Sequence, residues 1–137
     1  MIRRVAIIDL NALCRLFSYI QPKWTDKMIE DAINKSGADF LVYDDGGLLA
    51  GFICIEYVLG EGCITAIATD TAYRNKGIAR SLISYGETLR EKTNIYLEVE
   101  ENNKPAIGLY SSCGFSAVGK RKNYYGDNAA IIMNKEF

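Results

Sequence analysis

The sequence predicts an α+β fold, in which a central mixed, largely antiparallel sheet of about seven strands is flanked by four helices. Strand-like and helix-like segments follow one another in the order β-α-α-β-β-β-α-β-α-β-β, so strands outnumber helices. Several neighbouring strands are joined by tight turns, which is typical of antiparallel pairing. The chain has 137 residues, 49% of them hydrophobic. This length and composition predict one compact domain over residues 1–137.

The strands are predicted from short runs of apolar and β-branched residues bounded by turn residues. In the 40–58 run, a turn at Asp44–Gly47 joins two strands, and the last two runs are expected to form a hairpin around Gly126, Asp127 and Asn128. The expected strand segments are 3–9, 40–58, 63–69, 95–100, 115–125 and 129–135.

The helices are predicted from apolar residues at helical spacing together with capping residues at the ends. Asp9 is expected to cap a helix over Leu10–Ile20, and Thr25 a second helix over Asp26–Ser36. The two later helices are expected at 78–89 and 105–113.

Composition excludes several classes of protein. The formal net charge is -1 and the sequence pI is about 5.5, which disfavours a general nucleic-acid binder. The sequence contains no apolar run of the roughly 18 residues that a membrane-spanning helix requires. The four cysteines are widely spaced without a C-x-x-C pair, so we expect free thiols and a reducing cytoplasm. The chain has no histidine, which excludes a Ser-His-Asp triad and histidine zinc sites, and we expect no metal.

The segment YRNKGIARSL, residues 73–82, predicts an anion site. It runs from the end of a strand into a helix, where backbone N–H groups are free donors and the helix dipole adds positive charge. Gly77 allows a ligand to approach the backbone closely, and Arg74, Lys76 and Arg80 add full charges. A diphosphate would fit this environment, although an ordinary loop with solvated charges has the same composition. The chain has no Walker A motif, and GGLLAG at residues 46–51 is expected in a hairpin, so it does not qualify as a Rossmann turn.

Two motifs in this order resemble those of the GCN5-related N-acetyltransferase (GNAT) family. Arg74-x-x-Gly77-x-Ala79 resembles the family's acyl-CoA signature, and NKPAIGLYSSCGF, residues 103–115, resembles a second family segment. Further segments, among them IATD, YLEVEENN, KRKNYY and AIIM, are most similar to the ribosomal-protein-alanine N-acetyltransferases of the RimI type. The resemblance implies the GNAT fold over most of the chain and acetyl-CoA as co-substrate.

The resemblance also implies roles for individual residues. It assigns Glu98 as the proton acceptor for the incoming amine and Tyr110 as the proton donor for the leaving thiolate. The residues it matches to positions that contact acetyl-CoA are Ile67, Ala68 and Thr69 on a strand edge, Arg74, Asn75, Lys76, Gly77, Ile78, Ala79 and Arg80 in the pyrophosphate loop, and Asn103 and Ala106.

Without the resemblance, residue type and sequence pattern allow more than one role at several of these positions. Strand alternation places Glu98 on the face opposite Leu97, where it is either a base in a cleft or a solvated carboxylate. Tyr110 on a short helix is either an acid or a core aromatic. Tyr124 and Tyr125 at a hairpin tip are candidates for clasping a peptide. Trp24 either forms the opposite wall of a peptide groove or anchors its loop to the core.

The expected acceptor is the N-terminal α-amine of a protein, with a ribosomal protein favoured by the resemblance. About a tenth of α-amines are neutral at pH 7, against about one lysine in 2,500, so an enzyme without histidine is better suited to the former. The alternatives are a GNAT enzyme acting on a small amine or on lysine, and a CoA-binding sensor that has lost catalysis. The sequence leaves the oligomeric state open.

Overall fold

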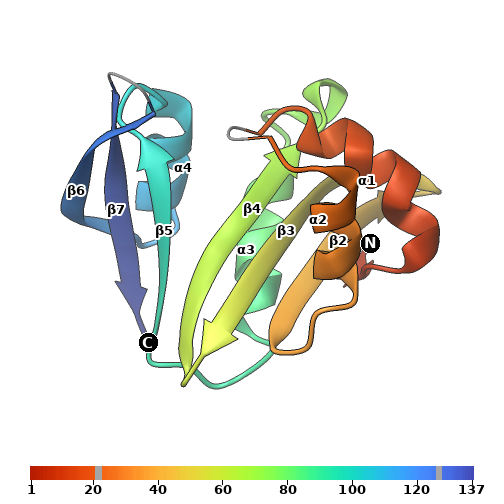
Figure 1. Ribbon diagram of the computed structural model, residues 1–137, viewed down its shortest axis with the longest axis horizontal. Coiled ribbons are helices and arrows are strands. Elements are labelled where there is room, and N and C mark those ends of the chain that lie inside the picture. Colours follow the sequence, from red (N-terminus) through yellow and green to blue (C-terminus); the bar gives the residue numbers. More distant parts are fainter. Residues whose placement is uncertain (21–22, 126–127) are drawn as a thin grey trace. The chain divides into compact units, whose positions relative to one another are not determined.

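The computed structural model of the chain describes residues 1–20, 23–125 and 128–137, with the side chains of residues 123–125 left out. These residues form four α-helices and seven strands (Figure 1). The helices are α1 (Leu10–Phe17), α2 (Asp26–Ile33), α3 (Ile78–Glu87) and α4 (Lys104–Ser112). The strands are β1 (Ile2–Arg4), β2 (Ala38–Asp45), β3 (Leu48–Val58), β4 (Glu61–Thr69), β5 (Asn94–Glu100), β6 (Ser116–Tyr125) and β7 (Asn128–Glu136).

The strands belong to one sheet in the order β1-β2-β3-β4-β5-β7-β6. The pairs β1–β2, β2–β3, β5–β7 and β6–β7 are antiparallel, whereas β4 and β5 run parallel. The predicted fold class, a mixed and largely antiparallel sheet with four helices, is therefore confirmed. The chain divides into two compact units, one formed by residues 1–56 and 65–89 and the other by residues 57–64 and 90–137.

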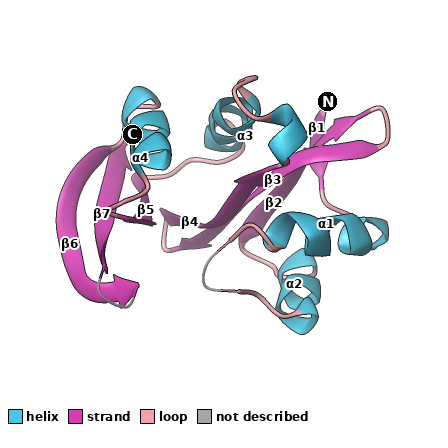
Figure 2. Cartoon of the chain, turned by 90° about the horizontal axis from the view of Figure 1, so that it is seen from above, coloured by secondary structure: helices cyan, strands magenta, loops and turns pink. Residues whose placement is uncertain are grey.

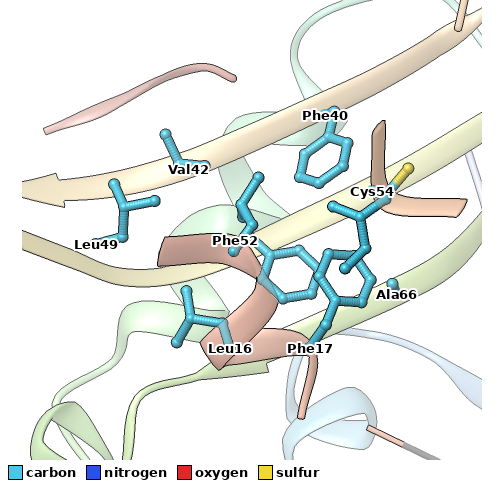
Figure 3. Close-up of a cluster of buried hydrophobic side chains, with 10 residues drawn as sticks. Leu16, Phe17, Phe40, Val42, Leu49, Phe52, Cys54 and Ala66 are labelled. Atoms are coloured by element: carbon cyan, nitrogen blue, oxygen red, sulfur yellow. The ribbon is translucent and has the colours of Figure 1, made fainter. Parts of the chain in front are cut away.

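In the first unit, helices cover both faces of the strands β2 and β3 (Figure 2). Phe17 of α1 stacks on Phe52 of β3 with 4.3 Å between ring centroids, and Phe40 of β2 joins the same buried cluster (Figure 3). The opposite face of β3 meets α3. There a Cβ atom at Gly86 would lie 2.8 Å from Ile55 Cδ1, so a larger residue would require the end of the Ile55 side chain to move. Because side chains alternate between the two faces of β3, Phe52 packs on α1 and Ile55 packs on α3.

The start of the chain differs from the sequence prediction. The expected strand over residues 3–9 is a three-residue strand, Ile2–Arg4, followed by a 3-10 helix over Ile7–Asp9. Asp9 precedes α1 but makes no side-chain cap to it. Its carboxylate accepts hydrogen bonds from the Arg3 guanidinium at 2.9 Å and from the Ala6 N–H at 2.8 Å. A charged partner on β1 therefore draws this carboxylate away from the helix end.

Other local predictions are confirmed. Thr25 caps α2, because its hydroxyl oxygen accepts a hydrogen bond from the Met28 N–H at 3.2 Å. The turn at Asp44–Gly47 joins β2 and β3, and the Asp44 carboxylate accepts a hydrogen bond from the Gly47 N–H at 2.7 Å. The predicted hairpin joins β6 and β7, with Tyr125 paired to Asn128, although Gly126 and Asp127 lie outside the described residues.

In the second unit, α4 covers one face of β5 and β7. Lys135 of β7 donates a hydrogen bond from Nζ to the carbonyl oxygen of Cys113, just after α4, at 2.8 Å. Ile95 of β5 lies directly opposite Lys135, and directly opposite residues of an antiparallel pair share a face. The odd-numbered residues of β5 therefore face α4 and are buried, while residues 96, 98 and 100 face the other way.

Candidate active site

The predicted anion loop lies between β4 and α3, after a short 3-10 turn over Thr71–Tyr73. Asn75 and Gly77 both have positive φ, at 63° and 79°. Gly77 is the N-cap of α3, and its carbonyl accepts the first helical hydrogen bond, from the Ser81 N–H at 3.0 Å. Helix geometry leaves the N–H groups of residues 77–79 without a carbonyl partner inside α3. The loop thus presents a turn of backbone donors at the positive end of a helix dipole.

Asp70 holds this loop in place from three sides. Its backbone N–H donates to the Ala50 carbonyl at 2.8 Å, which fixes the end of β4 against β3. One carboxylate oxygen accepts from the Ala72 N–H at 2.9 Å, and the other pairs with the guanidinium of Arg15 on α1. The hydrogen bond from Ala72, followed by that from Arg15, holds the pKa of Asp70 below its ordinary value. Sequence reasoning gave Asp70 no role, although an aspartate two residues before an N–H donor is a common turn signal.

The cations of the loop are exposed to solvent. The Arg74 guanidinium lies 5.5 Å from the centre of the Tyr19 ring, and its Nε is 3.5 Å from the Thr69 carbonyl oxygen. Lys76 Nζ lies 5.6 Å from the ring centre of Tyr73. Exposed cation–ring contacts contribute about 0.5–1 kcal/mol, so an anion can draw these side chains away at little cost.

The predicted strand edge, Ile67–Thr69, forms the last residues of β4 and leads directly into the loop. All three residues are partly exposed. A Cβ atom at Gly51 of β3 would lie 2.8 Å from the Ala68 carbonyl oxygen, so the two backbones approach closely here. The structure therefore brings the strand-edge residues and the anion loop together within the first unit.

Glu98 and Tyr110 both lie in the second unit. Glu98 is on the β5 face that points away from α4, and its Oε1 accepts a hydrogen bond from Arg121 Nη2 at 2.6 Å. Tyr110 lies on α4 and is buried, with its ring centroid 6.2 Å from that of Phe115 in an edge-to-face arrangement. The two predicted proton carriers thus approach β5 from opposite faces. Sequence reasoning did not identify the partner Arg121.

The edge of β5 near Glu98 is only partly paired. Its parallel pairing with β4 joins residues 61–63 to residues 94–96 and extends no further among the described residues. Its other edge pairs with β7 along its whole length. Among the described residues, strand β5 therefore pairs with β4 only over its first three residues and with β7 from end to end.

Asn103 and Ala106 begin α4. The Asn103 side chain is the N-cap, and its Oδ1 accepts a hydrogen bond from the Ala106 N–H at 3.3 Å. This structural role uses the amide oxygen, and the NH₂ group of the same side chain is a separate hydrogen-bond donor.

Of the residues predicted to bind the acceptor, the structure describes the side chain of Trp24 only. Trp24 packs on Phe17 with 4.8 Å between ring centroids and joins the edge of the buried cluster, so the contacts favour the anchoring interpretation. Tyr124 and Tyr125 lie on β6, but their side chains are outside the described part of the chain.

Among the described residues, no group of three or more Cys, Asp or Glu side chains is arranged to hold a metal ion. None of the helices in residues 1–20, 23–125 and 128–137 has both the length and the apolar character needed to cross a membrane.

Comparison with known proteins decides the family. The sequence model of the acetyltransferase (GNAT) family matches residues 5–115, more than half of the chain. The chain belongs to the GNAT acetyltransferase family. The family match and the named relatives show that it is an acetyl-CoA-dependent N-acetyltransferase.

Several GNAT relatives resemble the chain over most of its length. A Bacillus subtilis protein named as a candidate ribosomal protein bS18-alanine N-acetyltransferase is 36% identical over 139 residues, which cover 96% of this chain and 92% of that protein. The ribosomal protein bS18-alanine N-acetyltransferase of Escherichia coli is 32% identical over 117 residues, covering 80% of this chain and 78% of the relative. The crystal structure of the ribosomal-protein-S18-alanine N-acetyltransferase from Escherichia coli has a TM-score of 0.90 at 28% identity, covering 99% of this chain and 92% of that one.

Proposed function

We propose that this acetyltransferase transfers the acetyl group of acetyl-CoA to the N-terminal α-amine of a protein, and that a ribosomal protein with an N-terminal alanine is the first acceptor to test. The observation that carries the proposal is the 36% identity over 96% of the chain to a relative named for this reaction. The second named relative, at 32% identity, supports the same acceptor class.

The loop of residues 74–80 is proposed to hold the diphosphate of acetyl-CoA. Its backbone donors, its helix N-terminus and its exposed cations all favour a bound anion. The β4 edge over Ile67–Thr69 is proposed to pair with the extended pantetheine arm, since it leads directly into the loop. Asn103 and Ala106 are proposed to contact the same ligand at the start of α4.

Glu98 is proposed to accept the proton of the amine, directly or through a water molecule. The amine nitrogen then attacks the thioester carbonyl carbon, a C–N bond forms, and the C–S bond to CoA breaks. Tyr110 is proposed to donate a proton to the departing thiolate. The placement of these two groups on opposite faces of β5 supports this division, because base and acid then serve opposite ends of one reacting centre.

The lack of histidine supports an α-amine rather than a lysine as acceptor. The pKa of an α-amine is about 2.5 units below that of a lysine side chain, which corresponds to about 3.4 kcal/mol. A carboxylate base offers little driving force to cover that difference. We also propose that residues 1–137 work as one acetyltransferase domain in the cytoplasm, a compartment in which the four cysteine thiols stay reduced.

The test is a mass-shift assay with the purified chain, acetyl-CoA and a panel of acceptors. We expect a peptide with a free N-terminal alanine to gain one acetyl group on its α-amine. The same peptide with a blocked N-terminus and an internal lysine serves as the matched control and is expected to react far more slowly. Faster reaction of the blocked peptide, or of a small polyamine, would replace the N-terminal acceptor by lysine or a small amine. Binding of acetyl-CoA without transfer to any acceptor would indicate a CoA-binding sensor.

A further inference from the structure

Arg121 of β6 and Glu98 of β5 form an ion pair across the strand that separates them. Arg121 Nη2 lies 2.6 Å from Glu98 Oε1, a short charge-assisted hydrogen bond. The Glu98 side chain is only 20% exposed, whereas that of Arg121 is 57% exposed. The contact therefore restrains a largely buried carboxylate from the solvent side.

The register of the sheet explains how the two side chains meet. Glu98 lies opposite Ile132 of β7, and Arg121 lies opposite Ala130, so the contact runs diagonally over β7. Neighbouring strands are about 4.8 Å apart, so β5 and β6 are separated by roughly 10 Å. A long side chain is needed to cover that distance. The small side chain of Ala130 lies between them and leaves the path open.

The ion pair with Arg121 uses only one of the two carboxylate oxygens of Glu98. Arg121 binds Oε1, which leaves Oε2 as the oxygen that can accept a proton from an amine or a water molecule. A glutamate on a sheet face otherwise samples several rotamers, and holding one of them in advance removes that entropy cost from the reaction. Because the carboxylate is planar and rigid, holding Oε1 in place also fixes the direction in which Oε2 points.

We propose that Arg121 is a positioning residue for acetyl transfer, which holds Glu98 in the orientation in which Oε2 meets the acceptor amine. This inference rests on the proposed role of Glu98 as the proton acceptor. In this inference Arg121 does not contact the substrate and acts on the reaction through its hydrogen bond to Glu98.

The chain offers a matched control in the neighbouring residue. Lys120 lies opposite Ile131, and Ile131 lies opposite Val99, so Lys120 is on the face of the sheet that α4 covers. Its Nζ forms an ion pair with Glu101 at 2.9 Å, with side-chain exposures of 54% and 29%. The two ion pairs are alike in distance and exposure, but only one of them involves Glu98.

The experiment compares Arg121→Gln, Arg121→Lys and Lys120→Gln in steady-state acetylation of an alanine peptide. We expect kcat of Arg121→Gln to fall by about tenfold to a hundredfold, while the affinity for acetyl-CoA stays within twofold of the parent. Arg121→Lys should recover part of the loss, because it keeps the charge but not the fork. Lys120→Gln should leave kcat unchanged.

A double substitution separates positioning from a structural effect. At pH 9 the amine is largely deprotonated, so Glu98→Gln retains measurable activity. Adding Arg121→Gln to Glu98→Gln should then cause no further loss, because the residue through which Arg121 acts is gone. A further loss as large as in the parent, an unchanged or raised kcat in Arg121→Gln, or an equal loss in Lys120→Gln would each overturn the inference. A parent enzyme that acetylates no α-amine would instead refute the proposed function.

Discussion

Gly51 of β3 and Ala68 of β4 lie closer together than any side chain would allow. A Cβ atom at Gly51 would be 2.8 Å from the Ala68 carbonyl oxygen and 3.1 Å from Ile78 Cγ2. The obstacle is a backbone atom of the strand that leads into the anion loop, so it cannot move without displacing the strand. Gly108 in the middle of α4 is the opposite case, since a Cβ atom there meets nothing within 4 Å.

We therefore expect Gly51→Ala to lower the free energy of unfolding by about 1–3 kcal/mol, the usual cost of overpacking. Gly108→Ala should raise it by roughly 0.5–1 kcal/mol, because alanine favours the helix without a clash. Urea denaturation of both variants measures the two changes. Equal effects of the same sign would contradict the packing argument.

Substitution of Gly77 tests the anion loop with a matched control in Gly60. The two residues have φ values of 79° and 81°, and an added Cβ meets nothing within 4 Å at either position. Asparagine tolerates this conformation better than most residues, so Gly77→Asn mainly adds a side chain where the diphosphate is expected. We expect acetyl-CoA binding to weaken by at least tenfold, about 1.4 kcal/mol, in Gly77→Asn and to stay unchanged in Gly60→Asn. Calorimetry that gives equal affinities for the two variants would remove the loop assignment.

Asp9 is expected to contribute to stability in a way that depends on pH. Hydrogen bonds from Arg3 are the largest cause holding its pKa below the ordinary value of 3.8. A depressed pKa in the folded state stabilises the fold above pH 3.8, and this contribution is lost as the pH falls through the folded-state pKa. In Asp9→Asn the free energy of unfolding should be lower at pH 7 and should fall less steeply below pH 4. Denaturation between pH 2 and pH 7 measures both, and parallel curves for variant and parent would exclude this linkage.

Tyr110→Phe tests the proposed acid. The substitution keeps the buried ring and its contact with Phe115 but removes the proton. We expect kcat to fall by about a hundredfold or more with acetyl-CoA affinity little changed, since general acid catalysis typically contributes about 10²–10⁴-fold. Thiol release measures kcat and calorimetry the affinity. Equal turnover in variant and parent would make Tyr110 a core residue only.

Glu98→Gln tests the proposed base through the pH dependence of the acceptor. We expect most activity to be lost at pH 7, where about a tenth of α-amines are neutral, and part of it to return by pH 9, where most are neutral. Rates of peptide acetylation across this range provide the measurement. A loss that is the same at every pH would show that Glu98 acts in some way other than accepting a proton.

Much of the fold followed from local features of the sequence. The Thr25 cap, the Asp44–Gly47 turn and the alternation along β5 depend on residues a few positions apart, so their signals survive without tertiary context. The strand prediction over residues 3–9 was right for Arg3 and Arg4 but wrong beyond them. The apolar run looks like a strand, whereas Asp9 binds Arg3 and closes a 3-10 turn. The role of Trp24 could be decided only from the structure, because the residues next to it in the sequence do not indicate that it packs on Phe17.

The sequence by itself determined the loop with its glycine at the start of α3, the face of β5 that carries Glu98, and the family motifs around them. Only the tertiary structure decided which side chains hold these groups in place. Arg15 meets Asp70 across 55 positions of sequence, and Arg121 meets Glu98 across 23. Backbone conformation is set largely by neighbouring residues, whereas such long-range partners are fixed by strand register and helix packing, which depend on the burial of apolar side chains along the whole chain.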